Sequence, residues 1–160
     1  MSDASSAAAL QEIAVEAGTV VVSETGDGVF TQQLLDGRHR LLADEPVTAG
    51  GKDLGPGPYE LLLMALGACT SMTVRLYANR KQWPLQRVTV RLKHTRSYPS
   101  DCKECESKPV MLDHVDREIE FAGDLSDEQR ARLLEMAQKC PVHRTLSQRV
   151  EIATRMRNIS

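Results

Sequence analysis

The chain has 160 residues, of which 41% are hydrophobic, so its length suits a single domain with a real core. Lys and Arg number 20 against 22 Asp and Glu, and only 4% of the residues are aromatic. With a net charge of -2 and few rings, the chain lacks the basic surface and the stacking platform that bind nucleic acids. We therefore expect no nucleic-acid partner.

The beginning of the chain and its apolar runs bear on targeting. Residues 1–10 read MSDASSAAAL, with an acid where a secretory signal has basic residues and without a long apolar stretch. We expect residues 1–18 to form a flexible leader and residues 19–160 to form one domain. The longest apolar run, Leu61–Ala68, is shorter than the roughly 20 residues that span a bilayer. These features predict a cytoplasmic protein with no membrane partner, whose four cysteines stay reduced.

The first part of the expected domain alternates short apolar pieces with turn residues. We expect strands over residues 19–23, 29–35 and 38–42, with Asp36–Gly37 as a hairpin turn between the last two. Strand alternation would place Arg38 and Arg40 on one face. Residues 49–58 (AGGKDLGPGP) predict a loop, and the Ser or Thr that follows Lys in a phosphate-binding loop is missing.

Residues 59–80 (YELLLMALGACTSMTVRLYANR) predict one long helix. Its expected apolar stripe comprises Leu62, Leu66, Cys69, Met72 and Leu76. Because no charge lies between Glu60 and Arg75, we expect this helix to be central and covered on most sides.

The second half predicts two more strands, over residues 85–95 and 115–121, and a helix that begins at a capping box, Ser126 to Gln129. That helix should run to about Lys139. Its expected apolar side comprises Leu133, Leu134, Ala137 and Cys140. Pro141 suits the first position of a further short helix, and alternation at Val150 and Ile152 predicts a closing strand. The order of elements indicates an α+β fold.

The candidate chemistry is carried by cysteines. Cys69 lies on a Leu-rich helix, where a cysteine is usually an inert core residue. Cys140 has positive neighbours, Lys139, His143 and Arg144, and would sit at the start of the helix opened by Pro141. Positive charge and a helix N-terminus both stabilise a thiolate, so the residues alone favour Cys140 as the more acidic thiol.

Other titratable groups leave alternatives open. Cys102 and Cys105 form a C-x-x-C that suits a redox dithiol, half of a zinc site with His94 or His114, or a solvated loop with idle thiols. His143 suits either a general base or a structural hydrogen bond.

Glu60 lies nine residues before Cys69, about 13 Å along a straight helix and on its other side. It therefore suits a first-turn acid that complements the helix dipole. A catalytic role for Glu60 would need a break in the helix or a partner chain.

Two segments together resemble the cysteine motifs of the OsmC/Ohr family, which comprises osmotically inducible protein C and the organic hydroperoxide resistance proteins. They are Gly55–Met72 (GPGPYELLLMALGACTSM) and Lys139–Leu146 (KCPVHRTL). In hydroperoxide resistance members a glutamate directly follows the proline, whereas Tyr59 does so here and Glu60 comes next. The chain is more similar to the branch of redox proteins and regulators of disulfide bond formation.

The resemblance implies an intertwined α+β homodimer with antiparallel sheets around two central cysteine-bearing helices. It also implies reduction of organic hydroperoxides, in which Cys69 forms a sulfenic acid and Cys140 then closes a disulfide. The same resemblance implies that Arg38 or Arg40 activates the thiolate and that Glu60 pairs with this arginine. An external dithiol would then reduce the disulfide. No cofactor is implied. The alternative is a non-catalytic module that binds a small apolar ligand, or zinc at Cys102 and Cys105.

Overall fold

The computed structural model describes residues 13–97 and 112–157. The chain divides into two compact units, Met1–Leu62 and Leu63–Ser160, and each is described by itself. Cys102 and Cys105 lie outside the described residues, so the alternatives for that C-x-x-C stay predictions.

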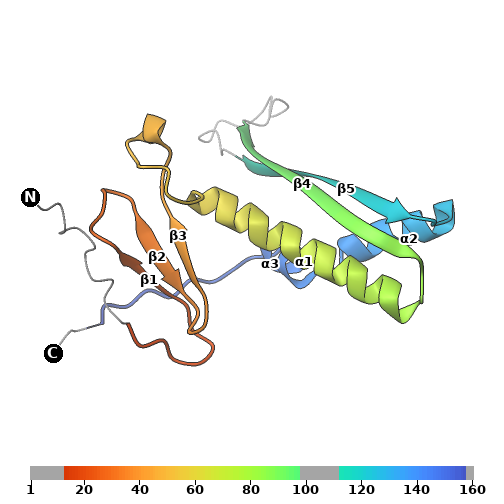
Figure 1. The fold of residues 1–160 in the computed structure, drawn as a ribbon, viewed down its shortest axis with the longest axis horizontal. Helices are drawn as coiled ribbons and strands as arrows, with labels where there is room; N and C mark the ends of the chain where they lie inside the picture. Colours follow the sequence, from red (N-terminus) through yellow and green to blue (C-terminus); the bar gives the residue numbers. More distant parts are fainter. Residues whose placement is uncertain (1–12, 98–111, 158–160) are drawn as a thin grey trace, which may run out of the picture. The chain divides into compact units, whose positions relative to one another are not determined.

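The first unit holds a three-stranded antiparallel sheet of β1 (Val21–Glu24), β2 (Gln32–Leu35) and β3 (Arg40–Ala43), with β2 in the centre (Figure 1). The predicted turn between β2 and β3 is confirmed, because Asp36 Oδ1 accepts from the backbone N of Arg38 at 2.9 Å and of His39 at 2.7 Å. Arg38 therefore belongs to the turn and not to a strand. The prediction that Arg38 and Arg40 share one face of a strand is wrong, since β3 begins only at Arg40.

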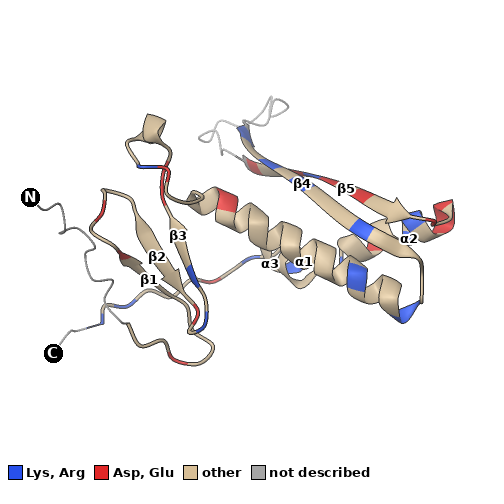
Figure 2. Ribbon diagram, viewed as in Figure 1, with Lys and Arg blue, Asp and Glu red and all other residues tan. Residues whose placement is uncertain are grey.

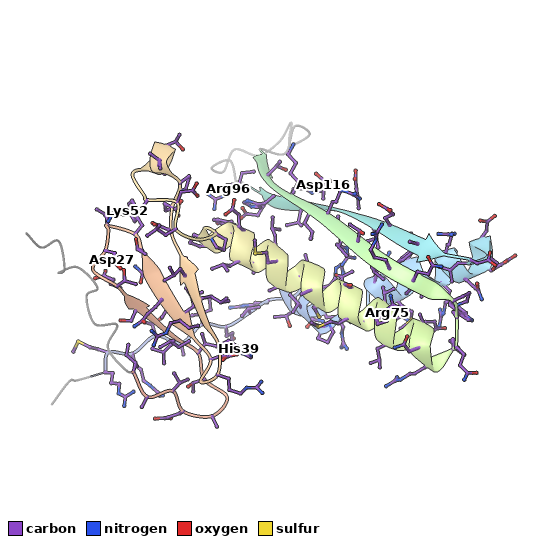
Figure 3. All side chains as sticks on the ribbon, viewed as in Figure 1. Asp27, His39, Lys52, Arg75, Arg96 and Asp116 are labelled. Carbon is purple, nitrogen blue, oxygen red and sulfur yellow. The ribbon has the colours of Figure 1, made fainter. Side chains whose placement is uncertain are left out.

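The loop that follows β3 is organised around one buried carboxylate. Asp44 is 2% exposed and accepts from the Thr31 hydroxyl at 3.1 Å and from the backbone N of Lys52 at 3.2 Å. A short 3-10 helix, η1 (Val47–Ala49), lies within this loop. The Lys52 ammonium also donates to the carbonyl of Asp27, so two loops are joined (Figure 3). The Gly- and Pro-rich loop predicted here is confirmed and has a defined structure.

The second unit is built on α1 (Pro58–Arg80), whose first residues belong to the other unit. It continues with the hairpin of β4 (Leu85–Ser97) and β5 (Leu112–Gly123), then α2 (Asp127–Ala137) and α3 (Pro141–Leu146). Figure 1 shows α1 running along the long hairpin, with the two short helices beside it. Gly67 permits close approach, since a Cβ there would lie 2.9 Å from Leu92 Cδ1 of β4.

One core cluster fixes the C-terminal end of α1. Its buried members are Val74, Ala78, Leu85, Leu125, Leu133 and Ala137. They come from α1, β4 and α2, together with Leu125, which precedes the N-cap residue of α2. One apolar cluster therefore joins three elements. Arg75 adds polar links, because its guanidinium donates to the carbonyl oxygens of Leu85 at 2.5 Å and Gln86 at 2.9 Å (Figure 3).

The buried face of α1 differs from the predicted stripe. The buried positions are Leu66, Thr70, Val74 and Ala78, spaced by four residues. From the predicted stripe, Leu62 is 41% exposed, Met72 69% and Leu76 53%, so their assignment to the core of this chain is wrong. A polar residue, Thr70, takes a place in the core because its hydroxyl has hydrogen-bonding partners there.

Much of α1 is therefore apolar and exposed. Figure 2 shows no charged residue along its middle, between Glu60 and Arg75. By length and composition, α1 could cross a membrane, with a mean hydropathy of 1.5 over its most apolar window, of which 22% is buried. The expectation that α1 is covered on most sides does not hold within one chain.

The C-terminal helices agree closely with the sequence. The capping box is present, with Ser126 Oγ accepting from Gln129 N at 3.2 Å and Gln129 Oε1 accepting from Ser126 N at 3.0 Å. Pro141 is the first residue of α3, as predicted. Two details are wrong: Leu134 is 50% exposed, and residues 150–152 form no strand.

Candidate functional site

Two cysteines that are far apart in sequence meet inside the second unit. Cys69 lies in the middle of α1, on the turn between the buried Leu66 and the buried Thr70. Cys140 lies between α2 and α3 and is the N-cap residue of α3. The Cys69 side chain is one of the groups that lower the pKa of Cys140, so the two thiols lie near each other. Both are free thiols; Cys69 is half-buried and Cys140 is 0% exposed.

Cys140 is held by donors from two elements. Its Sγ accepts from the backbone N of His143 at 3.2 Å, which is the capping bond of α3. The Thr70 hydroxyl lies 3.6 Å from the same sulfur. Sulfur buried without such partners would favour the neutral thiol, so these bonds decide its chemistry.

A cation reaches this pair of thiols from the hairpin. Arg117 of β5 pairs with Leu92 of β4, and its Nη1 donates to Thr70 Oγ1 at 3.0 Å and to the carbonyl of Ala137 at 3.3 Å. The second bond satisfies a carbonyl at the end of α2, where the helix itself offers no donor. Arg117 therefore fastens the hairpin to α1 and α2 beside Cys140.

Together these contacts make Cys140 the acidic thiol. Burial raises the pKa of Cys140, but hydrogen bonds from His143 N, the Thr70 hydroxyl and the Cys69 side chain lower it, as does the positive charge of Arg117. The lowering effects prevail, and the pKa lies below the ordinary cysteine value. This result agrees with the local sequence, which favoured Cys140 as the more acidic thiol.

A pocket with a volume of about 430 Å³ lies beside Arg117 and His143, two residues that contribute to the pKa of Cys140. Its lining combines apolar and polar side chains: Leu66, Asp113, Val115, Arg117, His143, Leu146 and Ser147. Arg117 and His143 both line the pocket and act on Cys140, so it is a place where a small molecule would come close to the thiols.

The remaining predicted site residues lie elsewhere or have structural contacts. Arg38 and Arg40 belong to the first unit, in the turn and at the start of β3. Glu60 Oε2 accepts from Gly57 N at 2.7 Å, so it caps the start of α1, as its first-turn position suggested.

The histidines considered as zinc ligands bond to carboxylates, His94 to Asp113 at 2.8 Å and His114 to Asp116 at 3.1 Å. Within residues 13–97 and 112–157, no group of three or more His, Cys, Asp or Glu is arranged to hold a metal.

Sequence reasoning missed Thr70 and Arg117. A signal for Arg117 was present, because alternation in the predicted strand over residues 115–121 places it on the same face as Val115, Ile119 and Phe121. A cation among apolar residues needs a partner in the core. Thr70 had no comparable signal, since a threonine beside a helical cysteine is an ordinary residue.

Several solved structures have a fold similar to that of this chain. An OsmC-like protein from Mycoplasma pneumoniae is 22% identical with a TM-score of 0.61, covering 81% of this chain and 84% of its own. An organic hydroperoxide resistance protein OsmC, predicted redox protein and regulator of sulfide bond formation, from Legionella pneumophila is 19% identical with a TM-score of 0.57, covering 80% and 88%.

An organic hydroperoxide resistance protein from Elizabethkingia anophelis, with thiocyanate bound, is 17% identical with a TM-score of 0.55, covering 79% and 84%. At such identities the likeness concerns the fold. No curated protein matches the chain. The profile of the OsmC-like protein family matches residues 50–155, which include both cysteine motifs. The chain belongs to the OsmC-like family.

Proposed function

We propose that this protein is a thiol-dependent redox protein that reduces organic hydroperoxides through a sulfenic acid and disulfide cycle at Cys69 and Cys140. The observation that carries the proposal is the meeting of two free thiols, one of them acidified, next to a pocket. The hydroperoxide resistance proteins among its structural relatives support the choice of substrate.

Access decides which thiol meets the peroxide. Cys140 has no exposed surface, whereas Cys69 is half-buried, so of these two thiols Cys69 is the one that a peroxide can reach. The Cys69 thiolate attacks one peroxide oxygen, the O–O bond breaks, and the other oxygen leaves as an alkoxide that takes a proton to become an alcohol. Cys69 is thereby oxidised to a sulfenic acid.

Cys140 then completes the cycle. Its thiolate attacks Cys69 Sγ, a disulfide bond forms, and the S–O bond breaks, with hydroxide leaving and taking a proton to become water. An external dithiol reduces the disulfide by two successive thiolate attacks. No cofactor enters this cycle, and the same two sulfur atoms return to the thiol state.

The exposed surface of α1 supports a proposal about the partner of this chain. Apolar residues such as Met64, which is 57% exposed, and Met72 leave a helix face that a second copy of the chain would cover. We propose a homodimer on this face, and a cytoplasmic location, where the external dithiol pool keeps both thiols reduced. A nucleic acid or a membrane is not part of the proposal.

The test is consumption of cumene hydroperoxide with dithiothreitol as reductant, by the wild type, Cys69→Ser and Cys140→Ser. Turnover should be lost in Cys69→Ser, because the remaining described thiol, Cys140, has no exposed surface. Cys140→Ser, oxidised with one equivalent of peroxide in the absence of dithiothreitol, should accumulate a sulfenic acid at Cys69 that dimedone labels. Unchanged turnover in Cys69→Ser would refute the assignment.

The same assay distinguishes the proposed peroxidase from a non-catalytic ligand-binding module. The pocket gives that alternative a specific basis, because a cavity of about 430 Å³ can hold a small ligand without any turnover. A matched control is Thr73→Val, which changes a threonine of α1 whose hydroxyl donates to the Cys69 carbonyl at 2.8 Å. Absence of turnover in the wild type as well as in the cysteine variants would favour the binding module.

A further inference from the structure

Thr70 is the meeting point of three groups. Its Oγ1 lies 2.8 Å from the Leu66 carbonyl, 3.0 Å from Arg117 Nη1 and 3.6 Å from Cys140 Sγ. Both Thr70 and Cys140 are 0% exposed, so these contacts are shielded from water. We propose that Thr70 and Arg117 are positioning residues that hold Cys140 as a thiolate aimed at the oxidised sulfur of Cys69.

The hydroxyl can serve only one acceptor at a time. It has one proton and two lone pairs, and Arg117 can only donate, so Arg117 occupies a lone pair. While the Thr70 proton points to the Leu66 carbonyl, Cys140 can bond to Thr70 only as a thiol that donates. When Cys140 ionises, the Thr70 proton turns to the sulfur. The Leu66 carbonyl keeps its helical partner, the backbone N of Thr70, so this rotation leaves no buried group without a partner.

Arg117 gives the rotation its direction. Its guanidinium donates into the Thr70 oxygen, which makes the hydroxyl proton a better donor to the sulfur. Its charge also favours the thiolate directly. Among the described residues, Arg117 forms no ion pair, and the carboxylate that shares its pocket, Asp113, is bound to Arg96 at 2.9 Å. The charge of Arg117 is thus available to Cys140.

The groups that face Cys140 come from three elements. Cys69 and Thr70 belong to α1, Arg117 to β5 and His143 to α3. Cys69 is the only one of these that changes during the proposed cycle. The inference rests on that cycle for its meaning, because the ionised Cys140 is the nucleophile that breaks the S–O bond of the Cys69 sulfenic acid, with water as the leaving product.

The test measures ionisation and needs no peroxide. In a background of Cys69→Ser, Cys102→Ser and Cys105→Ser, Cys140 is the only thiol, and its thiolate is followed by ultraviolet absorbance against pH. Adding Thr70→Val or Arg117→Gln should raise the midpoint by about one unit each, since each removes a group that stabilises the thiolate. Thr70→Ser keeps the hydroxyl and Arg117→Lys keeps the charge, so both should shift the midpoint less.

Matched controls remove similar groups that do not touch Cys140. Thr73→Val loses the same kind of bond to a helix carbonyl, and Arg91→Gln loses a charge from the same hairpin, where Arg91 pairs with Glu120 at 3.2 Å. Both should leave the midpoint unchanged. Equal midpoints for Thr70→Val, Thr70→Ser and the controls would overturn the inference. A raised midpoint in a protein that consumes no peroxide would uphold the positioning pair and refute only the proposed peroxidase.

Discussion

Arg117 donates to the hydroxyl of Thr70 across 3.0 Å, and this bond ties the hairpin to α1 beside Cys140. A charged residue on the apolar face of a strand normally costs stability, because its charge loses water. Here the protein supplies two acceptors, the Thr70 oxygen and the Ala137 carbonyl. These two hydrogen bonds offset part of the cost of burying the cation. The same cation lowers the pKa of Cys140.

The core beneath the site gives a clear prediction of stability. Leu133 of α2 is 0% exposed in the cluster with Val74 and Ala78, whereas its neighbour Leu134 is 50% exposed. Leu133→Ala should lower the free energy of unfolding by about 2–5 kcal/mol, because it leaves a cavity in a packed cluster. Leu134→Ala should change it by about 0.5 kcal/mol or less. Urea denaturation followed by circular dichroism measures both, and equal losses would contradict the assigned core.

The exposed face of α1 predicts association. Met72→Lys places a charge on the helix face where Met72 is 69% exposed and Leu76 is 53% exposed. If a second copy covers this face, the variant should shift from dimer to monomer, because a buried unpaired charge is costly. Size-exclusion chromatography with light scattering measures the mass, and Leu134→Lys serves as the control. A wild-type monomer that binds lipid vesicles would instead favour a membrane as the cover.

Asp44 predicts a dependence of stability on pH. Burial raises the pKa of Asp44, but the backbone donors of Glu45, Leu54 and Lys52 and the Thr31 hydroxyl lower it, and its net pKa is below the ordinary value. The carboxylate therefore stabilises the fold above the unfolded pKa of about 4, and this stability is lost as the pH falls through the folded pKa.

The variant that tests this is Asp44→Asn. It should be less stable than the wild type at pH 7, and the difference should shrink in acid as the wild-type carboxylate is protonated. Asp124→Asn, at an exposed position, should behave like the wild type at each pH. Thermal melts at pH 7 and pH 3 give the comparison, and a difference that stays constant or grows in acid would contradict the role of Asp44.

Much of the fold could be predicted from local patterns. The capping box at Ser126, Pro141 at the start of α3 and the turn at Asp36 each depend on a few neighbouring residues. The buried face of α1 could not be predicted, because a stripe of apolar residues looks the same whether it meets its own chain or is left exposed. The predicted strand at Val150 and Ile152 failed because alternation does not supply a pairing strand, and these residues are 53% and 85% exposed.

The site was predictable in part. The acidity of Cys140 followed from its position before Pro141, since the capping bond from His143 N is a local feature. Its contacts with Thr70 and Arg117 depend on how α1, β5 and the segment between α2 and α3 pack, which no local pattern encodes. Alternation in β5 places Arg117 on the apolar face, but the sequence does not name its partner.

Peptide mapping shows whether Cys69 and Cys140 act as one redox pair. The reduced wild type is treated with one equivalent of cumene hydroperoxide, blocked with an alkylating agent, digested and analysed by mass spectrometry. We expect a disulfide between the peptides that contain Cys69 and Cys140, absent before oxidation. Oxidation that leaves both cysteines alkylated, or that joins either of them to a different cysteine, would contradict it.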